Sequence, residues 1–142
     1  MTALAALRPD SWGFPLLLHV LGAMLLVGSL VAGLAFLGFV SARAAFRALL
    51  FGAVPGWILM RIGGQWIYSK EGWSGEDDPT WLGIGFFTAD LGGVLLLVTV
   101  ILAGLSSRRT GISILGRFAT GLATVLLVAY LVTVWAMTAK PS

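Results

Sequence analysis

Four long apolar runs dominate this sequence, at residues 16–40, 48–68, 82–105 and 118–137. About 20 apolar residues, at a helical rise of about 1.5 Å each, cross the hydrocarbon core of a bilayer. Only 11% of the residues are charged, whereas a soluble domain has about 25%, so too few are present to cover such helices in water. The sequence therefore predicts an all-α, polytopic membrane four-helix bundle that forms a single transmembrane domain over residues 1–142.

The residue types exclude several kinds of site. Cysteine is absent and histidine occurs once, at His19. One chain therefore cannot build a disulfide, an iron–sulfur cluster or a multi-histidine metal site, and we predict no metal ligands. No nucleophile stands beside a base, which argues against an enzyme. The net charge of +3 is typical of the loops of a membrane protein, so we expect no nucleic-acid partner and infer no cofactor from composition.

The basic residues are divided unequally between the two sides of the predicted bundle. Loops 41–47 and 106–117 together carry Arg43, Arg47, Arg108, Arg109 and Arg117. The opposite side carries Arg8, Lys70 and Lys140. The positive-inside rule then places both arginine-bearing loops in the cytoplasm and both termini outside, in an inner (plasma) membrane.

An acidic segment separates the second and third runs. Residues 69–80 contain Lys70 together with Glu71, Glu76, Asp77 and Asp78. Weak Ca²⁺ binding is one interpretation, but the spaced oxygen ligands of an EF-hand are missing. We interpret the segment as a solvated external loop.

Two opposite charges are expected at similar depth in neighbouring spans. Arg61 lies seven residues before Tyr68, and Asp90 lies eight residues after Leu82. The helical rise places them about 10 Å and about 12 Å from the same side of the membrane. Spans joined by a short loop usually pack as antiparallel neighbours, and an unpartnered charge within a span costs about 2.5–3.5 kcal/mol. We predict an intramembrane ion pair between Arg61 and Asp90.

Further polar residues fall at a similar depth. Gln65 and Tyr68 share a helix face with Arg61, and His19 in the first run lies near the depth of Gln65. We predict an outer-half polar pocket formed by His19, Arg61, Gln65, Tyr68 and Asp90. The alternative is purely structural: the ion pair fixes the register of the helices, and His19 and Gln65 donate hydrogen bonds to neighbouring spans.

Small residues recur at four-residue spacing. Gly52 and Gly56 form a GxxxG pair beside Pro55, which removes a backbone donor and predicts a kink. The same spacing occurs in two other pairs, Ser29 with Gly33 and Ala89 with Gly93. We expect these residues to pack helices within the bundle, with a homodimer face as the alternative.

The order of these features resembles a known group. The segments LLHVLGAMLLVGSLVAG, VPGWILMRIGGQWIYSKEGW, TWLGIGFFTADLGG and VWAMTAKP together resemble small bacterial membrane proteins of actinobacterial type with four spans. These are distantly similar to the broad group that contains the copper-resistance CopD membrane domain. The resemblance implies a four-helix membrane bundle with a histidine near the start of its first span, and it transfers no metal ligands to this chain.

The function that these features favour is a non-enzymatic accessory or binding component of a membrane assembly. Its expected partners are the lipid bilayer, a second copy of the chain or other membrane proteins. One alternative is a proton-linked transporter or carrier that uses His19, Arg61 and Asp90. Another is a haem-bearing redox protein in which His19 is an axial ligand at a dimer interface.

Overall fold

The computed structural model describes residues 13–73, 78–110 and 113–139. Within these ranges it contains helices and no strands. In chain order the elements are α1 (Gly13–Phe39), α2 (Ala42–Ala48), the π-helical turn η3 (Leu49–Ala53), α3 (Val54–Glu71), α4 (Thr80–Ser106) and α5 (Ile114–Ala139). Arg8, Glu76, Asp77 and Lys140 lie outside the described residues.

Four helices in the described part of the chain are long and apolar enough to cross a membrane. Three of them are α1, α4 and α5, and the fourth is the continuous 30-residue helix Ala42–Glu71 that α2, η3 and α3 form together. The predicted all-α four-helix bundle is confirmed, and the protein is a multi-pass membrane protein. The apolar outer surfaces of its helices contact the lipid bilayer.

The predicted loop 41–47 is wrong, because Ala42–Ala48 is helical. Ser41 caps this helix: its side-chain oxygen accepts a hydrogen bond from the backbone N–H of Ala44 at 3.1 Å. The alanine-rich sequence that follows strongly favours a helix. The loop predicted at 106–117 is also shorter than expected, since α5 begins at Ile114.

Pro55 acts on the backbone through the turn that precedes it. Proline has no N–H to donate to the preceding turn of a helix. The chain accommodates this with η3, after which the N–H of Val54 donates to the carbonyl of Leu49, five residues earlier. The backbone thus forms a π-helical turn directly before Pro55, and the kink predicted at this proline stays a prediction.

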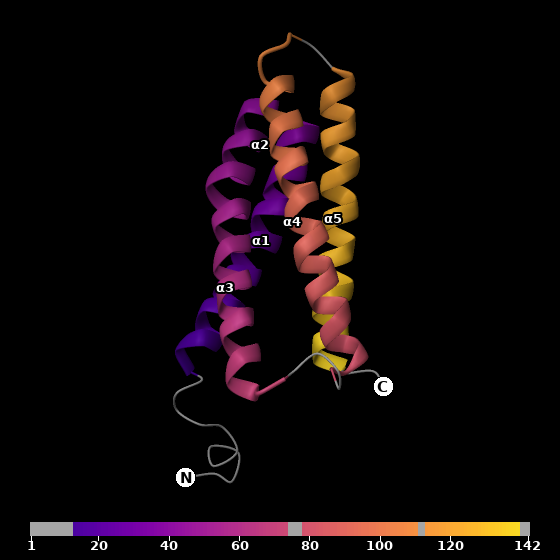
Figure 1. Ribbon diagram of the computed structural model, residues 1–142. Helices are drawn as coiled ribbons and strands as arrows, with labels where there is room; N and C mark the ends of the chain where they lie inside the picture. The colour runs from indigo at the N-terminus through magenta and orange to yellow at the C-terminus, as the bar shows by residue number, and fades with distance from the viewer. Residues whose placement is uncertain (1–12, 74–77, 111–112, 140–142) are drawn as a thin grey trace.

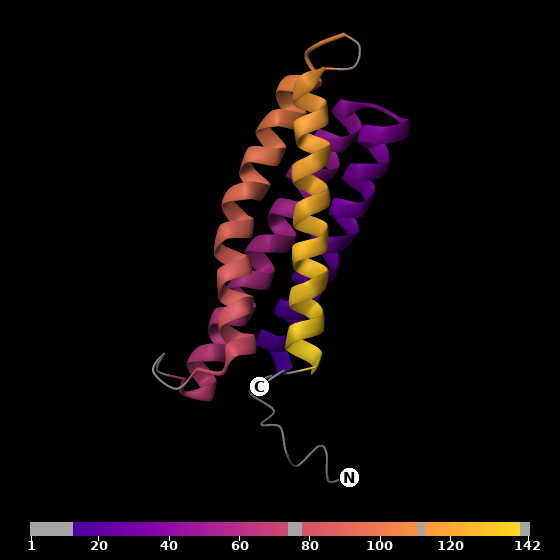
Figure 2. The same ribbon diagram turned by 90° about the vertical axis from the view of Figure 1, so that its right-hand side faces the viewer.

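The helices run along the length of one bundle (Figure 1). The beginning of α1, the end of α3, the beginning of α4 and the end of α5 lie at one end (Figure 1). The α1–α2 turn and the α4–α5 connection lie at the other end, and Figure 2 shows the same arrangement from the side. The most extensive contacts join α1 with α3 and α4 with α5, whereas α3 and α4 touch each other much less. The largest completely buried side chains of the core are Leu26, Leu30, Leu49, Leu96 and Leu126.

Glycines bring the backbones of α1 and α3 close together. A Cβ atom on Gly56 would lie 2.6 Å from the backbone nitrogen of Leu26, and one on Gly63 would lie 2.5 Å from that of His19. A Cβ on Gly52 would collide with the side chain of Ser29. The small residues of η3 and α3 therefore pack within the bundle, as expected, and this face is not free to form a homodimer.

Candidate functional site

Polar and aromatic side chains fill the space between α3 and α4, where the two backbones stand apart. We call this set the polar seam. Its residues are Trp57, Arg61, Gln65 and Tyr68 of α3 with Phe86, Ala89 and Asp90 of α4. The α3 members recur at intervals of three and four residues and therefore lie on the face that meets α4.

Trp57 forms the inner end of the polar seam. Its indole N–H donates a hydrogen bond of 2.8 Å to the carbonyl of Ala89. The ring occupies the space that glycine leaves on α4, because a Cβ on Gly93 would lie 2.5 Å from the indole. The predicted small-residue pair Ala89 and Gly93 thus receives an aromatic ring from α3.

Arg61 is the centre of the polar seam. Its Nε donates to Asp90 Oδ1 at 2.9 Å, and its Nη1 donates to Gln65 Oε1 at 2.9 Å. The guanidinium carbon lies 5.1 Å from the centre of the Phe86 ring, a distance suited to a cation–π contact. The equal depth of Arg61 and Asp90 along their helices brings the two charges together in the structure. That this ion pair lies within the membrane stays a prediction.

The carboxylate of Asp90 lies at the surface of the bundle. Its side chain is 63% exposed, whereas that of Arg61 is 27% exposed. Three exposed apolar residues, Phe87, Leu91 and Val94, surround it on the outer face of α4. Among the described residues, none donates a hydrogen bond to its second oxygen, Oδ2. The polar seam therefore presents a charged acceptor on a surface that is otherwise apolar.

Tyr68 forms the outer end of the polar seam. Its hydroxyl donates to Asp78 Oδ2 at 3.0 Å, and its ring meets the ring of Phe86 edge-on with the centres 5.0 Å apart. Tyr68 is linked to Arg61 through Phe86, which both side chains contact. The hydrogen bond to Asp78 ties the end of α3 to the residues that precede α4.

His19 lies apart from the other four predicted pocket residues. Its Nδ1 is 2.8 Å from the carbonyl oxygen of Met60, and a Cβ on Gly64 would lie 3.0 Å from that nitrogen. A carbonyl only accepts, so Nδ1 carries the proton and Nε2 is left as an acceptor. His19 thus approaches α3 from the side of α1, whereas Arg61 reaches toward α4. Binding of a ligand by these residues stays a prediction.

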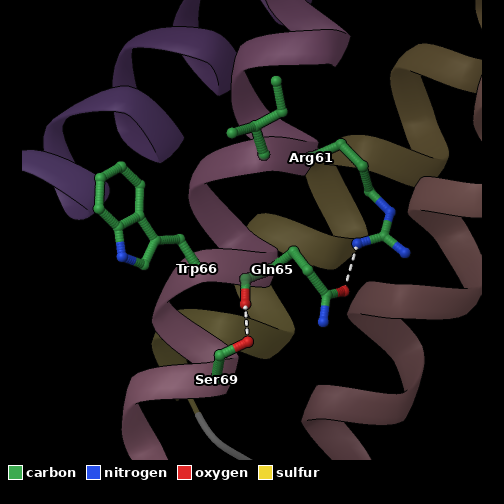
Figure 3. Close-up of a pocket in the computed structure, with 5 residues that line it drawn as sticks. Arg61, Gln65, Trp66 and Ser69 are labelled. Carbon is green, nitrogen blue, oxygen red and sulfur yellow. Dashed lines mark hydrogen bonds between the residues drawn. The ribbon is translucent and has the colours of Figure 1, made fainter.

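A shallow groove of about 580 Å³ runs along α3 beside the polar seam. It is lined by Arg61, Ile62, Gln65, Trp66 and Ser69. Figure 3 shows Arg61 and Gln65 directed to one side of the helix and Trp66 to the other, toward α1. Trp66 meets the ring of Phe14 edge-on at 6.1 Å, and Ser69 donates to the carbonyl of Gln65 at 3.0 Å. The groove joins an apolar wall to hydrogen-bonding groups.

The sequence analysis did not single out Trp57 and Phe86 as site residues. Trp57 precedes Arg61 by four residues, and Phe86 precedes Asp90 by four residues, so each shares a face with one member of the ion pair. This four-residue spacing in the sequence could have identified both aromatic residues as neighbours of the ion pair. Among the described residues, no three His, Cys, Asp or Glu side chains lie close enough to hold a metal ion together.

No protein-family model, no curated protein and no solved structure matches this chain. The resemblance to the group that contains the CopD membrane domain therefore stays a prediction. What the polar seam can do follows from its own groups. Asp90 offers an acceptor, Gln65 and Arg61 offer donors, and all three face the edge of an apolar surface.

Proposed function

We propose that this protein is a non-enzymatic accessory or binding component of a membrane assembly. In this proposal the α3–α4 face receives a transmembrane helix of a partner protein. The exposed carboxylate of Asp90 is the observation that carries it. Arg61 pairs with Oδ1 of this carboxylate, and Oδ2 accepts no hydrogen bond from a described residue, so a donor on a partner helix would supply the bond that Oδ2 lacks next to lipid.

The surroundings of Asp90 support a helix as the ligand. Phe87, Leu91 and Val94 follow helical spacing with Asp90, so together they offer an apolar strip with one polar group. A second helix would cover this strip and supply a donor such as Asn, Gln, Ser or Lys. The hydrogen bonds of Arg61 to Asp90 and Gln65 hold the carboxylate in place before the partner arrives.

The proposal includes an inner (plasma) membrane location with both termini outside. It is supported by the placement of α2, which carries Arg43 and Arg47, and of the arginine-bearing α4–α5 connection at one end of the bundle (Figure 1). The other end carries the acidic residues Glu71 and Asp78. By the positive-inside rule, the arginine end faces the cytoplasm.

A bulky substitution on the proposed face tests the association. Val94 on α4 and Val128 on α5 are matched controls for each other, since they are 59% and 56% exposed on surfaces that face lipid. The full chain is purified from its own membranes in mild detergent and weighed by native mass spectrometry. We expect the wild type and V128W to carry a second membrane protein in stoichiometric amount. We expect V94W to lose most of this partner.

Two outcomes would contradict the proposal. The first is a wild-type protein that is strictly monomeric and free of partner chains in every mild detergent. The second is equal retention of the partner by V94W and V128W, which would move the contact away from the α3–α4 face. A complex that contains only a second copy of the chain identifies a homo-oligomer and contradicts the different partner that we propose.

A haem-bearing redox protein is the second candidate, and His19 favours it. Histidines that bind a metal through one ring nitrogen usually donate the other N–H to a carbonyl or carboxylate. The hydrogen bond to Met60 gives His19 this arrangement, with Nε2 left to bind. One histidine per chain would require the second axial ligand to come from another copy or another side chain. A Soret band that His19→Ala abolishes would support this candidate, and a colourless wild type would exclude it.

The proton-linked carrier has weaker support from the described residues. A path across the membrane needs polar groups beyond the polar seam, toward the arginine end. The buried polar groups in the described part of the chain are the side chains of Thr99 and Ser106 and the hydroxyl of Tyr130, which lies against Gly92 of α4. Thr99 donates to the carbonyl of Leu95 at 2.7 Å, and Ser106 is hydrogen-bonded to Ser113 at 2.7 Å. Among the described residues, no hydrogen bond links Asp90 to Tyr130, Thr99 or Ser106, so these groups form no hydrogen-bonded relay.

A further inference from the structure

A second groove lies on α5, far from the polar seam. Its volume is about 390 Å³, and its lining is Ile114, Arg117, Phe118, Gly121, Leu122 and Val125. Except for Arg117, every lining side chain is apolar or absent. The residues follow helical spacing, so the groove forms a strip along one side of α5.

The strip faces away from the core of the bundle. The buried residues of α5 include Ala119, Ala123 and Leu126, which alternate with the groove residues along the helix. Phe118 and Val125 are exposed. Figure 2 shows α5 running along the bundle with no other helix in front of it. In a multi-pass membrane protein, this outer strip is in contact with lipid.

Gly121 makes the hollow in the strip. A Cβ at this position would meet no atom within 4 Å, so packing within the bundle does not require a glycine here. The missing side chain leaves a gap on the outer surface between Phe118 and Val125. This glycine differs from Gly56 and Gly63 of α3, whose Cβ atoms would strike the backbone of α1.

The end of the groove near the beginning of α5 is strongly basic. Ser106 at the end of α4 is hydrogen-bonded to Ser113, which precedes α5, so Arg108 and Arg109 lie at the same end of the bundle as Arg117 in the first turn of α5. On the same end, Phe46 of α2 contacts α4, since a Cβ on Gly104 would lie 3.0 Å from its ring. This contact adds the two arginines of α2 to the same end of the bundle.

No acidic residue offsets these charges. Five arginines lie at this end of the bundle, and the sequence has no Asp or Glu between residues 11 and 70 or after residue 90. In the described part of the chain, no salt bridge or side-chain hydrogen bond involves any of the five. Their guanidinium groups are therefore open to a phosphate.

We propose that the α5 groove binds one anionic phospholipid. The phosphate lies at Arg117, and one acyl chain follows the strip across Gly121 to Val125. Val125 is eight residues beyond Arg117, which places it about 12 Å deeper along the helix axis. Charge selects an anionic headgroup, and the apolar hollow selects an acyl chain, so a free phosphate satisfies only half of the site. This site lies on a different face from the proposed partner contact and does not depend on it.

The test measures lipid binding to the full chain by native mass spectrometry in detergent. The probes are dioleoyl phosphatidylglycerol and dioleoyl phosphatidylcholine, which share acyl chains and differ in headgroup charge. One arginine near an anionic lipid contributes about fivefold in affinity. We expect the wild type to prefer phosphatidylglycerol by about that factor and R117Q to lose the preference.

R43Q is the matched control for charge, because it removes one arginine from the same end but outside the groove. Its affinity for phosphatidylglycerol should fall by less than about twofold. G121L is the test of the hollow. It should weaken the binding of both lipids by about fourfold for each methylene displaced, whereas G28L should not. Gly28 is an exposed glycine of α1 that also has no atom within 4 Å of its Cβ position.

The following results would overturn the proposal. Equal binding of the two lipids by the wild type would show that the charge of the headgroup does not select the lipid. Equal losses in R117Q and R43Q indicate a diffuse basic surface instead of a site. Unchanged lipid binding in G121L, with a thermal unfolding temperature like that of the wild type, would show that the acyl chain does not bind in the groove. Displacement of the lipid by excess inorganic phosphate alone shows that the acyl chain contributes nothing.

Discussion

Replacing Gly56 by alanine tests the packing that positions α3 and the polar seam on it. The position lies in the middle of the α1–α3 contact, where a Cβ would lie 2.6 Å from the backbone nitrogen of Leu26. Ordinary contact begins at about 3.4 Å, so the two backbones must separate by about 0.8 Å. Backbone atoms cannot rotate away as a flexible side chain does, and the whole interface must therefore open.

The magnitude follows from the contacts that the separation weakens. A gap of about 0.5–1 Å removes a quarter to a half of each attraction of about 0.1–0.2 kcal/mol. Over about 40 atom pairs, the loss is about 1–4 kcal/mol, in the range of measured overpacking. Alanine is the better helix former by up to about 1 kcal/mol, which offsets only part of this loss. We expect a net decrease in the free energy of unfolding of about 2 kcal/mol.

The assay compares G56A with G28A by reversible unfolding in mixed detergent micelles. Gly28 is in the same bundle, and a Cβ there meets open space, so the same chemical change should be neutral or slightly stabilising. If G56A unfolds at the same detergent fraction as G28A, the close approach of α1 and α3 is wrong. Because the polar seam depends on where α3 lies, its geometry would then have to be revised.

The remaining predictions concern the polar seam. Asp90→Ala should lower the free energy of unfolding by about 1–3 kcal/mol, less than the 3–5 kcal/mol of a fully buried pair, because Arg61 keeps its bond to Gln65. The double variant with Arg61→Ala should recover part of that loss, and strict additivity in the double-mutant cycle would show that the two charges do not interact. Trp57→Phe removes the hydrogen bond to the carbonyl of Ala89 while keeping most of the ring. It should lower the free energy of unfolding by about 1 kcal/mol, and an unchanged unfolding curve would refute the bond.

Much of the polar seam could be anticipated from spacing. Arg61 and Asp90 lie at similar distances from a short connection, and antiparallel spans bring such residues to one level. Gln65 follows Arg61 by one helical turn, which explains the bond between them. Spacing does not tell which neighbour a helix face meets, and for this reason His19 was grouped with Arg61. In the structure, α1 contacts α3 on a different side from α4.

The sequence by itself determined the number of spans, their helical character and their need for lipid. Each of these depends on composition over about 20 residues, and no long-range contact alters it. Only the tertiary structure decided the pairing of α1 with α3, the distance between α3 and α4, and the exposure of Asp90. These depend on which glycines meet a backbone and which meet open space. Gly56 and Gly121 are the same type of residue, yet Gly56 lets two helices pack closely and Gly121 leaves a hollow on the outer surface.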